Sequence, residues 1–149
     1  MIWKPNVTVA AVVERNGRFL LVEEDIAGQL LVNQPAGHLE PGESLLDAAR
    51  RETREETAWE FEPDALLGIY RWRTRDGATT YLRFAFCGTV GKHNPDLPLD
   101  DTIRRVIWMN PEEIPKHRLR SPLVLRCIDD YRHGCRYPLS LLVDLNDET

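Results

Sequence analysis

The chain has 149 residues, of which 42% are hydrophobic and 29% are charged, and its formal net charge is −5. This length and composition suit one folded domain with one core, and no stretch approaches the roughly 18 apolar residues of a membrane span. The negative charge disfavours a long nucleic acid as a partner, because nucleic-acid binding depends on cationic groups that neutralise phosphates.

The first predicted element is a β-hairpin near the N-terminus. Residues 7–13 and 19–23 favour strands, and Asn16 and Gly17 between them favour a tight two-residue turn. We expect the two strands to pair across this turn.

The next predicted element is a helix of about fourteen residues. Ser44 precedes Asp47 by three positions, a pattern close to a capping box, in which the two side chains satisfy free backbone amides. No Gly or Pro interrupts the residues that follow. We expect the helix to run from Leu45 to about Ala58 and to end before a break at residues 61–63.

Three carboxylates on this helix fall on the side expected to face the protein. At about 100° per residue, Glu52, Glu55 and Glu56 share a wedge with the apolar residues of the helix. Arg50 and Arg54 lie on the opposite side. Two interpretations of the clustered negative charge remain: a solvated helix with weak surface ion pairs, or a divalent cation such as Mg²⁺ with oxygen ligands.

Further along the chain we expect a second hairpin, with strands at residues 66–74 and 79–90 on either side of an Asp-Gly turn. One more strand is expected at residues 104–109 and a helical turn at 111–114. A second long helix is expected at residues 121–134. In the second long helix, Ser121 is the expected N-cap and Gly134 the expected C-cap. The polar tail at residues 146–149 is expected to fray. Strands interspersed with two helices predict an α/β (α+β) fold with a mixed sheet between helices.

The acidic helix also belongs to a longer motif. Gly37, Glu43 and the run "RETREETAW" at 51–59 resemble the Nudix box, the signature of hydrolases that act on nucleoside diphosphates linked to another group. Two positions depart from that pattern: Thr53 replaces an aliphatic residue, and Ala58 replaces a glycine. The change at Ala58 removes the residue best suited to a left-handed helix end.

The resemblance extends beyond the box. The stretches "KPNVTVAAVV", "NQPAGHLE", "LRFAF", "LRSPLV" and "RYPL" resemble, in the same order, those of bacterial phosphatases in the Nudix family. This similarity implies one Nudix domain over residues 1–149 with the fold of an α/β/α sandwich, and we expect a monomer or weak dimer. Because the N-terminal stretch has no basic segment followed by a long apolar run, we expect a cytoplasmic location. The similarity also implies a Mg²⁺-dependent hydrolase, with Mn²⁺ as a substitute, that releases inorganic phosphate from nucleoside di- and triphosphates and from hydroxymethylpyrimidine diphosphate. A pyrophosphatase for ADP-ribose and a non-catalytic nucleotide-binding module are the alternatives.

The resemblance also implies residue roles. Mg²⁺ would be held by three carboxylates and one backbone carbonyl, those of Glu52, Glu55, Glu56 and Gly37. Glu43 and Arg51 would pair and fix the preceding loop to the helix.

The general base and the phosphate-binding residues are less specifically indicated. Glu52 is one candidate base, and a carboxylate outside the box, Asp100 or Asp101, is the other.

Three arginines lie on the second predicted hairpin, namely Arg71, Arg73 and Arg83. They could clamp phosphate or form the solvent-exposed side of a sheet. Trp72 could stack on a base, although we favour a core position for it.

Overall fold

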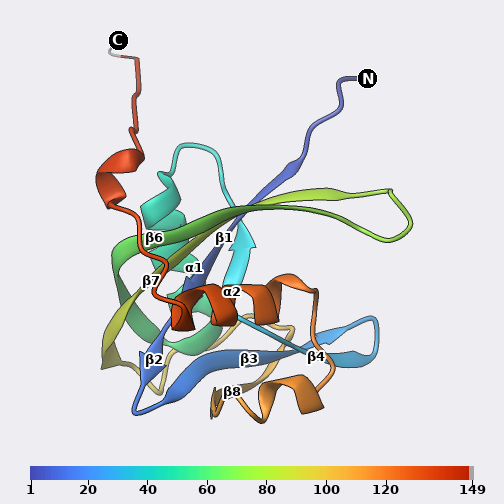
Figure 1. Ribbon diagram of the computed structural model, residues 1–149, viewed down its shortest axis with the longest axis vertical. Helices are drawn as coiled ribbons and strands as arrows, with labels where there is room; N and C mark the ends of the chain where they lie inside the picture. Colours follow the sequence, from blue (N-terminus) through green and yellow to red (C-terminus); the bar gives the residue numbers. More distant parts are fainter. Residues whose placement is uncertain (148–149) are drawn as a thin grey trace.

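A computed structural model describes residues 1–147 (Figure 1), so the last two residues of the polar tail lie outside the described part of the chain. The strands are β1 (Asn6–Val12), β2 (Glu14–Arg15), β3 (Arg18–Ile26), β4 (Gln29–Asn33), β5 (Ala36–His38), β6 (Trp59–Arg73), β7 (Thr80–His93) and β8 (Ile103–Met109). The helices are α1 (Leu45–Thr57) and α2 (Leu123–Arg132), with short 3₁₀ helices η1 (Ile114–Lys116) and η2 (Leu139–Leu141). No helix within residues 1–147 has both the length and the apolar character needed to cross a membrane.

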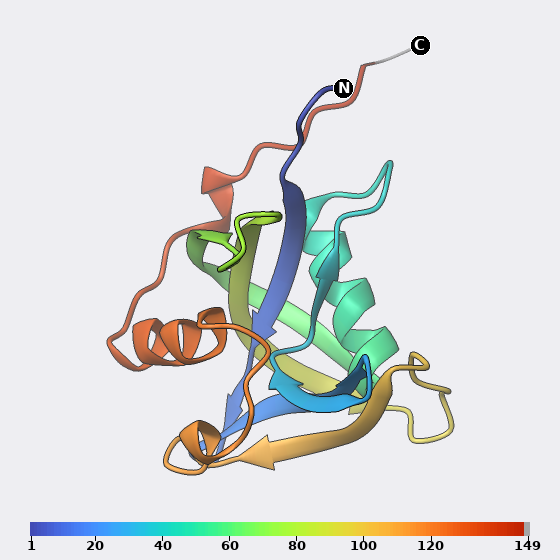
Figure 2. The ribbon, with the colours of Figure 1, turned by 90° about the vertical axis from the view of Figure 1, so that its right-hand side faces the viewer.

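The strands form two sheets between the two α-helices. One sheet has the order β5-β1-β7-β6; its β1 and β7 run parallel and its other pairs are antiparallel. The other sheet pairs β3 with β2, β4 and β8, all antiparallel. Figure 2 shows α1 and α2 on opposite sides of β1. The predicted α/β fold with helices around mixed β-structure is confirmed, although the strands divide into two sheets.

Strand β1 is buried on both faces because a helix covers each of them. Its successive side chains alternate between the two core clusters, as a strand requires. Val9 and Ala11 belong to the cluster that includes Ala48 of α1, whereas Ala10 and Val12 belong to the cluster of α2. This explains why the "VAAVV" run is continuously apolar rather than alternating.

Helix α1 begins and ends where the sequence predicts. The Ser44 hydroxyl accepts a hydrogen bond from the Asp47 amide at 3.1 Å. At the other end, Ala58 has a left-handed φ of 63°, and its amide donates to the Arg54 carbonyl. The buried alanine therefore adopts the helix-ending conformation that glycine adopts more readily. The predicted caps of helix α2 are each one residue too far out: the N-cap is Pro122 and not Ser121, and the C-cap is His133 and not Gly134. The Ser121 hydroxyl accepts a hydrogen bond from the Leu123 amide at 3.1 Å, and Gly134, just after the helix, has a positive φ of 85°.

The first predicted hairpin is only partly correct. Asn16 and Gly17 form the turn with positive φ values of 53° and 78°, but only Glu14 and Arg15 pair across it with β3. Residues 6–12 pair instead with β5 and β7, because the chain passes from one sheet to the other just before the turn. The short strands β4 and β5 were not predicted.

The break expected at residues 61–63 is wrong. Strand β6 runs through Pro63, and the β6–β7 register shifts on both sides of it, including between Pro63 and Ala65. Proline is tolerated here because β6 lies at the edge of its sheet and because bulges interrupt the hydrogen-bond ladder. The remaining elements, β7, β8 and the turn before η1, lie within a few residues of their predicted places.

Candidate active site

The acidic face of α1 forms one wall of a cavity of about 480 Å³. Glu52 and Glu56 are 9% and 5% exposed, whereas Glu55 is half-buried nearer the mouth. Glu56 accepts a hydrogen bond from the Ala36 amide of β5 at 2.9 Å. The helix therefore turns its carboxylates into the protein and not toward bulk solvent.

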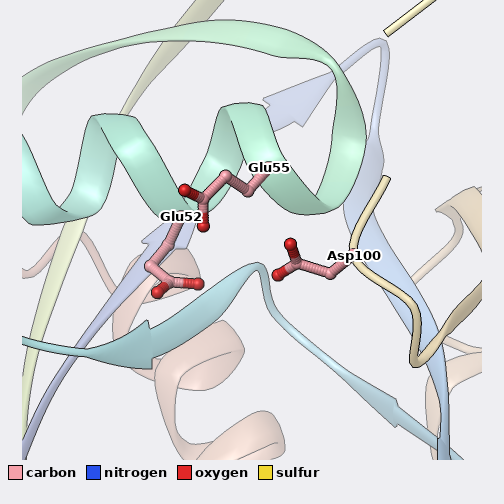
Figure 3. Close-up of side chains that lie close together, drawn as sticks. All are labelled: Glu52, Glu55 and Asp100. Carbon is pink, nitrogen blue, oxygen red and sulfur yellow. The ribbon is translucent and has the colours of Figure 1, made fainter. Parts of the chain in front are cut away.

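Asp100, from the loop before β8, joins two of these carboxylates. Oxygen atoms of Glu52, Glu55 and Asp100 all lie within 4.8 Å of one another (Figure 3). The Asp100 amide also donates to the Glu55 carbonyl at 3.0 Å, which fixes the loop against the end of α1. Asp100 and Asp101 are both exposed, but only Asp100 lines the cavity; the carbonyl of Asp101 accepts a hydrogen bond from Arg104. The structure thus separates the two aspartates that sequence reasoning left as equal candidates.

Arg51 connects the loop before α1 to the carboxylates. Its guanidinium forms a two-pronged pair with Glu43, with nitrogen–oxygen distances of 2.9 and 2.7 Å. The same group donates to Glu52 at 2.7 Å, to Glu55 at 3.2 Å and to the His38 carbonyl at 3.0 Å. Because the Arg51 side chain is only 15% exposed, these charge-assisted bonds define its position closely.

The cavity is lined by six carboxylates and three arginines, so its negative charge exceeds what the arginines can balance; the carboxylates are those of Glu24, Glu40, Glu52, Glu55, Glu56 and Asp100, and the arginines are Arg51, Arg83 and Arg120. Burial raises the pKa of Glu56 to about 9 and that of Glu52 to about 7, and neighbouring carboxylates add to both shifts. Burial likewise raises the pKa of Asp100 and of Glu24, which lies on β3 at the same cavity. Ionised carboxylates in this space therefore require a further cation.

The donor set fits a hard divalent cation. All the convergent groups are oxygen donors, the type that Mg²⁺ prefers. Gly37 adds a second observation, because a Cβ atom built on it would collide with the Glu52 carboxylate. The absence of a side chain at Gly37 therefore lets the backbone of β5 lie against Glu52.

The three arginines proposed as a phosphate clamp do not lie together. Tyr70 pairs with Arg83 across β6 and β7, so Arg83 shares the face of Tyr70, and Arg71 and Arg73 point the other way. Arg71 and Arg73 are exposed and do not line the cavity. Arg83 lines the cavity at 5% exposure.

Arg83 is a buried cation held by neutral groups. Its Nη1 atom donates to the Gln34 side chain at 3.0 Å, and its Nη2 atom donates to Asn33 at 3.2 Å. Its Nε atom has no hydrogen-bond partner among the described residues. The Nε atom is itself buried, so the observation that favours an anionic ligand is the position of this cation in the wall of the cavity that holds the carboxylates.

Four cavity residues were missed or misplaced by sequence reasoning. Trp72, expected in the core, is half-buried at the cavity and belongs to neither core cluster. Tyr81, Glu24 and Arg120 also line the cavity. The sequence indicates Glu24 weakly, because it is the second of two consecutive Glu residues at the end of an apolar strand. The positions of Tyr81 and Arg120 depend only on strand register and loop packing.

Comparison with known proteins places the chain among diphosphate-bond hydrolases. A model of the NUDIX domain matches residues 3–126. Phosphatase NudJ of Shigella boydii is 45% identical over 146 residues, which cover 97% of this chain and 95% of that protein. Phosphatase NudJ of Escherichia coli K12 is 44% identical with the same coverage. A solved NUDIX hydrolase from Nitrosomonas europaea is 50% identical, with a TM-score of 0.93, and covers 95% of this chain and 98% of the other.

Proposed function

Because the chain belongs to the NUDIX family, whose hydrolases act on diphosphate bonds, we propose that it is a Mg²⁺-dependent phosphatase of small nucleoside di- and triphosphates. The proposed single domain spans residues 1–149. One observation carries the proposal: carboxylates of Glu52, Glu55 and Asp100 converge in a cavity that also holds buried Glu56.

Four groups would hold the metal ion: the carboxylates of Glu52 and Glu55, which belong to the convergent set, and the carboxylate of Glu56 and the carbonyl of Gly37, which belong to residues of the same cavity. Mn²⁺ would substitute for Mg²⁺. A divalent ion bound there would neutralise phosphate charge and lower the pKa of a water molecule. The Glu43–Arg51 pair positions these groups, because Arg51 contacts both the loop and two of the carboxylates.

Asp100 is the group that we assign as general base. Its carboxylate lies with those of Glu52 and Glu55, and unlike Glu52 it receives no hydrogen bond from Arg51. Although Asp100 as a residue is exposed, partial desolvation of its carboxylate and the nearby Glu55 charge raise its pKa, which makes the carboxylate a better proton acceptor. In this assignment Asp100 takes the proton of the attacking water while Glu52 remains a ligand.

Arg83 supplies the positive end of the proposed site. Its side chain lines the cavity, and its Nε–H is buried without a partner among the described residues, so a phosphate would reach this donor only after a small shift of the side chain. We assign it to a phosphate oxygen, where a charge-assisted hydrogen bond would satisfy this donor.

The cavity size favours a small substrate. A volume of about 480 Å³ suits one nucleotide or a small pyrimidine diphosphate such as hydroxymethylpyrimidine diphosphate. ADP-ribose carries bulky groups on both sides of its diphosphate. The similarity to Phosphatase NudJ over nearly the whole chain supports phosphate release as the reaction.

Product analysis tests the proposal. Wild-type protein with Mg²⁺ is assayed against nucleoside di- and triphosphates, hydroxymethylpyrimidine diphosphate and ADP-ribose, with products followed by phosphorus NMR in labelled water. We expect inorganic phosphate as the main product, and a kcat/KM for ADP-ribose at least about tenfold lower, equivalent to about 1.4 kcal/mol. Pyrophosphate as the dominant product of a triphosphate would overturn the phosphatase assignment. ADP-ribose as the best substrate would favour the alternative function.

A further inference from the structure

Two aromatic side chains form part of the cavity wall without belonging to the core. Trp72 of β6 and Tyr81 of β7 are directly opposite each other in the ladder. Their rings stack with centroids 5.4 Å apart and an interplanar angle of 14°. Both are half-buried, both line the cavity, and neither is among the residues of the two core clusters.

The aromatic pair and Arg83 lie in sequence on one face of the sheet. Tyr81 and Arg83 are two residues apart on β7, so their side chains point to the same side. The pairings of β1 with its neighbours place Thr8 between Arg83 and His38, the residue next to Gly37. One face thus carries, in order, the rings, the buried guanidinium and His38 of β5. The carboxylates of α1 meet β5 at Gly37, which belongs to the other face, but they line the same cavity as the rings.

The spacing along this face matches a nucleotide. His38 and Tyr81 are separated by two strand spacings across the sheet and two residues along it, which places their Cα atoms about 12 Å apart. That separation is comparable with the distance between the base and the terminal phosphate of a nucleoside diphosphate. Because the carboxylates, Arg83 and the two rings line one cavity, a diphosphate at the carboxylates would extend its organic group toward the aromatic pair.

Resting on the proposed function, we propose that Trp72 and Tyr81 form a stacking platform for the planar heterocycle of the substrate. An aromatic platform binds any flat ring through its π-face and does not read hydrogen-bond patterns. The nearby amide groups of Gln34 and Asn33 are already engaged with Arg83. The platform itself therefore favours a substrate with a heterocyclic group over one without it, and does not discriminate between bases.

Binding measurements test the platform separately from hydrolysis. The probes are a nucleoside diphosphate analogue with a methylene bridge between its phosphorus atoms and methylenediphosphonate, which lacks the nucleoside. Calorimetry with Mg²⁺ should show at least about tenfold tighter binding of the nucleotide analogue to wild type. Trp72→Leu should remove most of this difference and leave methylenediphosphonate binding within about twofold, whereas Trp72→Phe should retain most of it. Trp3→Leu is the matched control, because Trp3 is 70% exposed and is not among the cavity residues.

Three results would overturn the platform. They are equal binding of the two probes by wild type, an unchanged preference in Trp72→Leu, and an equal loss of both probes in a Trp72→Leu protein whose thermal transition is intact. If Trp72→Leu does not fold, the binding of the same two probes is compared for the Trp72→Phe and Tyr81→Leu variants. Tyr81→Leu should then lose the preference for the nucleotide analogue, and Trp72→Phe should keep most of it. Absence of phosphate release by wild type would refute the proposed phosphatase activity, while the binding preference would still decide the platform.

Discussion

Glu56 is the most buried carboxylate of the site, and one backbone amide, that of Ala36, is its hydrogen-bond donor. Its environment disfavours the ionised form, as the raised pKa of about 9 indicates. A group of this kind destabilises the protein when it is ionised without a cation and contributes a ligand when a cation is bound. Stability and activity should therefore respond to it in opposite directions.

Replacing Glu56 separates these two effects. Glu56→Gln should lower turnover about hundredfold or more, because a ligand is lost, while its melting temperature without metal is unchanged or higher. Glu52→Gln should show the same pattern more mildly. Phosphate release and thermal unfolding are measured for both. Glu112→Gln is the control, since Glu112 is exposed and does not line the cavity. Turnover of Glu56→Gln within a few-fold of wild type would refute the ligand assignment.

Gly37 has no side chain, and this leaves space for the Glu52 carboxylate. In Gly37→Ala the added methyl group would occupy the place of the Glu52 carboxylate, so that carboxylate must move. We expect at least about tenfold lower turnover and weaker Mg²⁺ binding, with little change in the fold. Gly91→Ala is a matched control, because a Cβ at Gly91 meets open space. Equal activity of the two variants would show that Glu52 does not need its present position.

At the scale of elements, the loop before α1 is attached to the helix mainly through Arg51. The Glu43 carboxylate, which lies in this loop, accepts two hydrogen bonds from the Arg51 guanidinium and one from the Glu40 amide. These bonds hold the pKa of Glu43 below its ordinary value, the Arg51 bonds being the larger cause. The loop and helix therefore behave as one unit that carries Gly37 at one end and the carboxylates at the other.

Weakening this attachment should cost stability as well as activity. Glu43→Gln removes the charge but keeps the shape, and we expect a loss of about 1–2 kcal/mol in the free energy of unfolding together with several-fold lower turnover. Denaturant unfolding and steady-state assays measure the two quantities. Glu40→Gln is the comparison: Glu40 approaches Arg51 only to 3.5 Å and is 61% exposed, so its loss should be much smaller. A Glu43→Gln protein as stable and active as wild type would contradict the proposed attachment.

For the whole molecule, the buried carboxylates predict a pH-dependent stability. The pKa values of Glu52 and Glu56 rise on folding from about 4.5 to about 7 and about 9. Between the unfolded and folded values the folded protein binds more protons, so without metal its free energy of unfolding falls as the pH rises through this interval. Glu56→Gln should flatten this decline.

Mg²⁺ should reverse the decline at alkaline pH. Ligand carboxylates must be ionised to bind it, so the rise in melting temperature caused by Mg²⁺ should be larger near pH 9 than near pH 6. Activity should also increase toward alkaline pH and be lost in excess EDTA. Thermal unfolding across this range, with and without Mg²⁺, measures the first effect. A metal-induced shift that is independent of pH, or full activity in EDTA, would contradict the metal site.

Local patterns were sufficient for the helices and for the acidic motif. The Ser44 cap, the uninterrupted helical run and the spacing of Glu52, Glu55 and Glu56 are features of contiguous residues, and each depends on backbone periodicity alone. For this reason the bounds of α1 and the inward orientation of its acidic face could be predicted from the sequence.

Only the tertiary structure decided which distant residues complete the site. Asp100, and not Asp101, lines the cavity because a backbone hydrogen bond to Glu55 fixes the loop that carries it. Of the three arginines, only Arg83 lines the cavity, because the β6–β7 register places Arg71 and Arg73 on the other face. A shift of one residue in the β6–β7 register would exchange Arg83 for a neighbouring residue at the cavity, since successive side chains of a strand point to opposite faces. Register and loop attachment depend on contacts between residues far apart in the chain, and no periodicity in one segment encodes them.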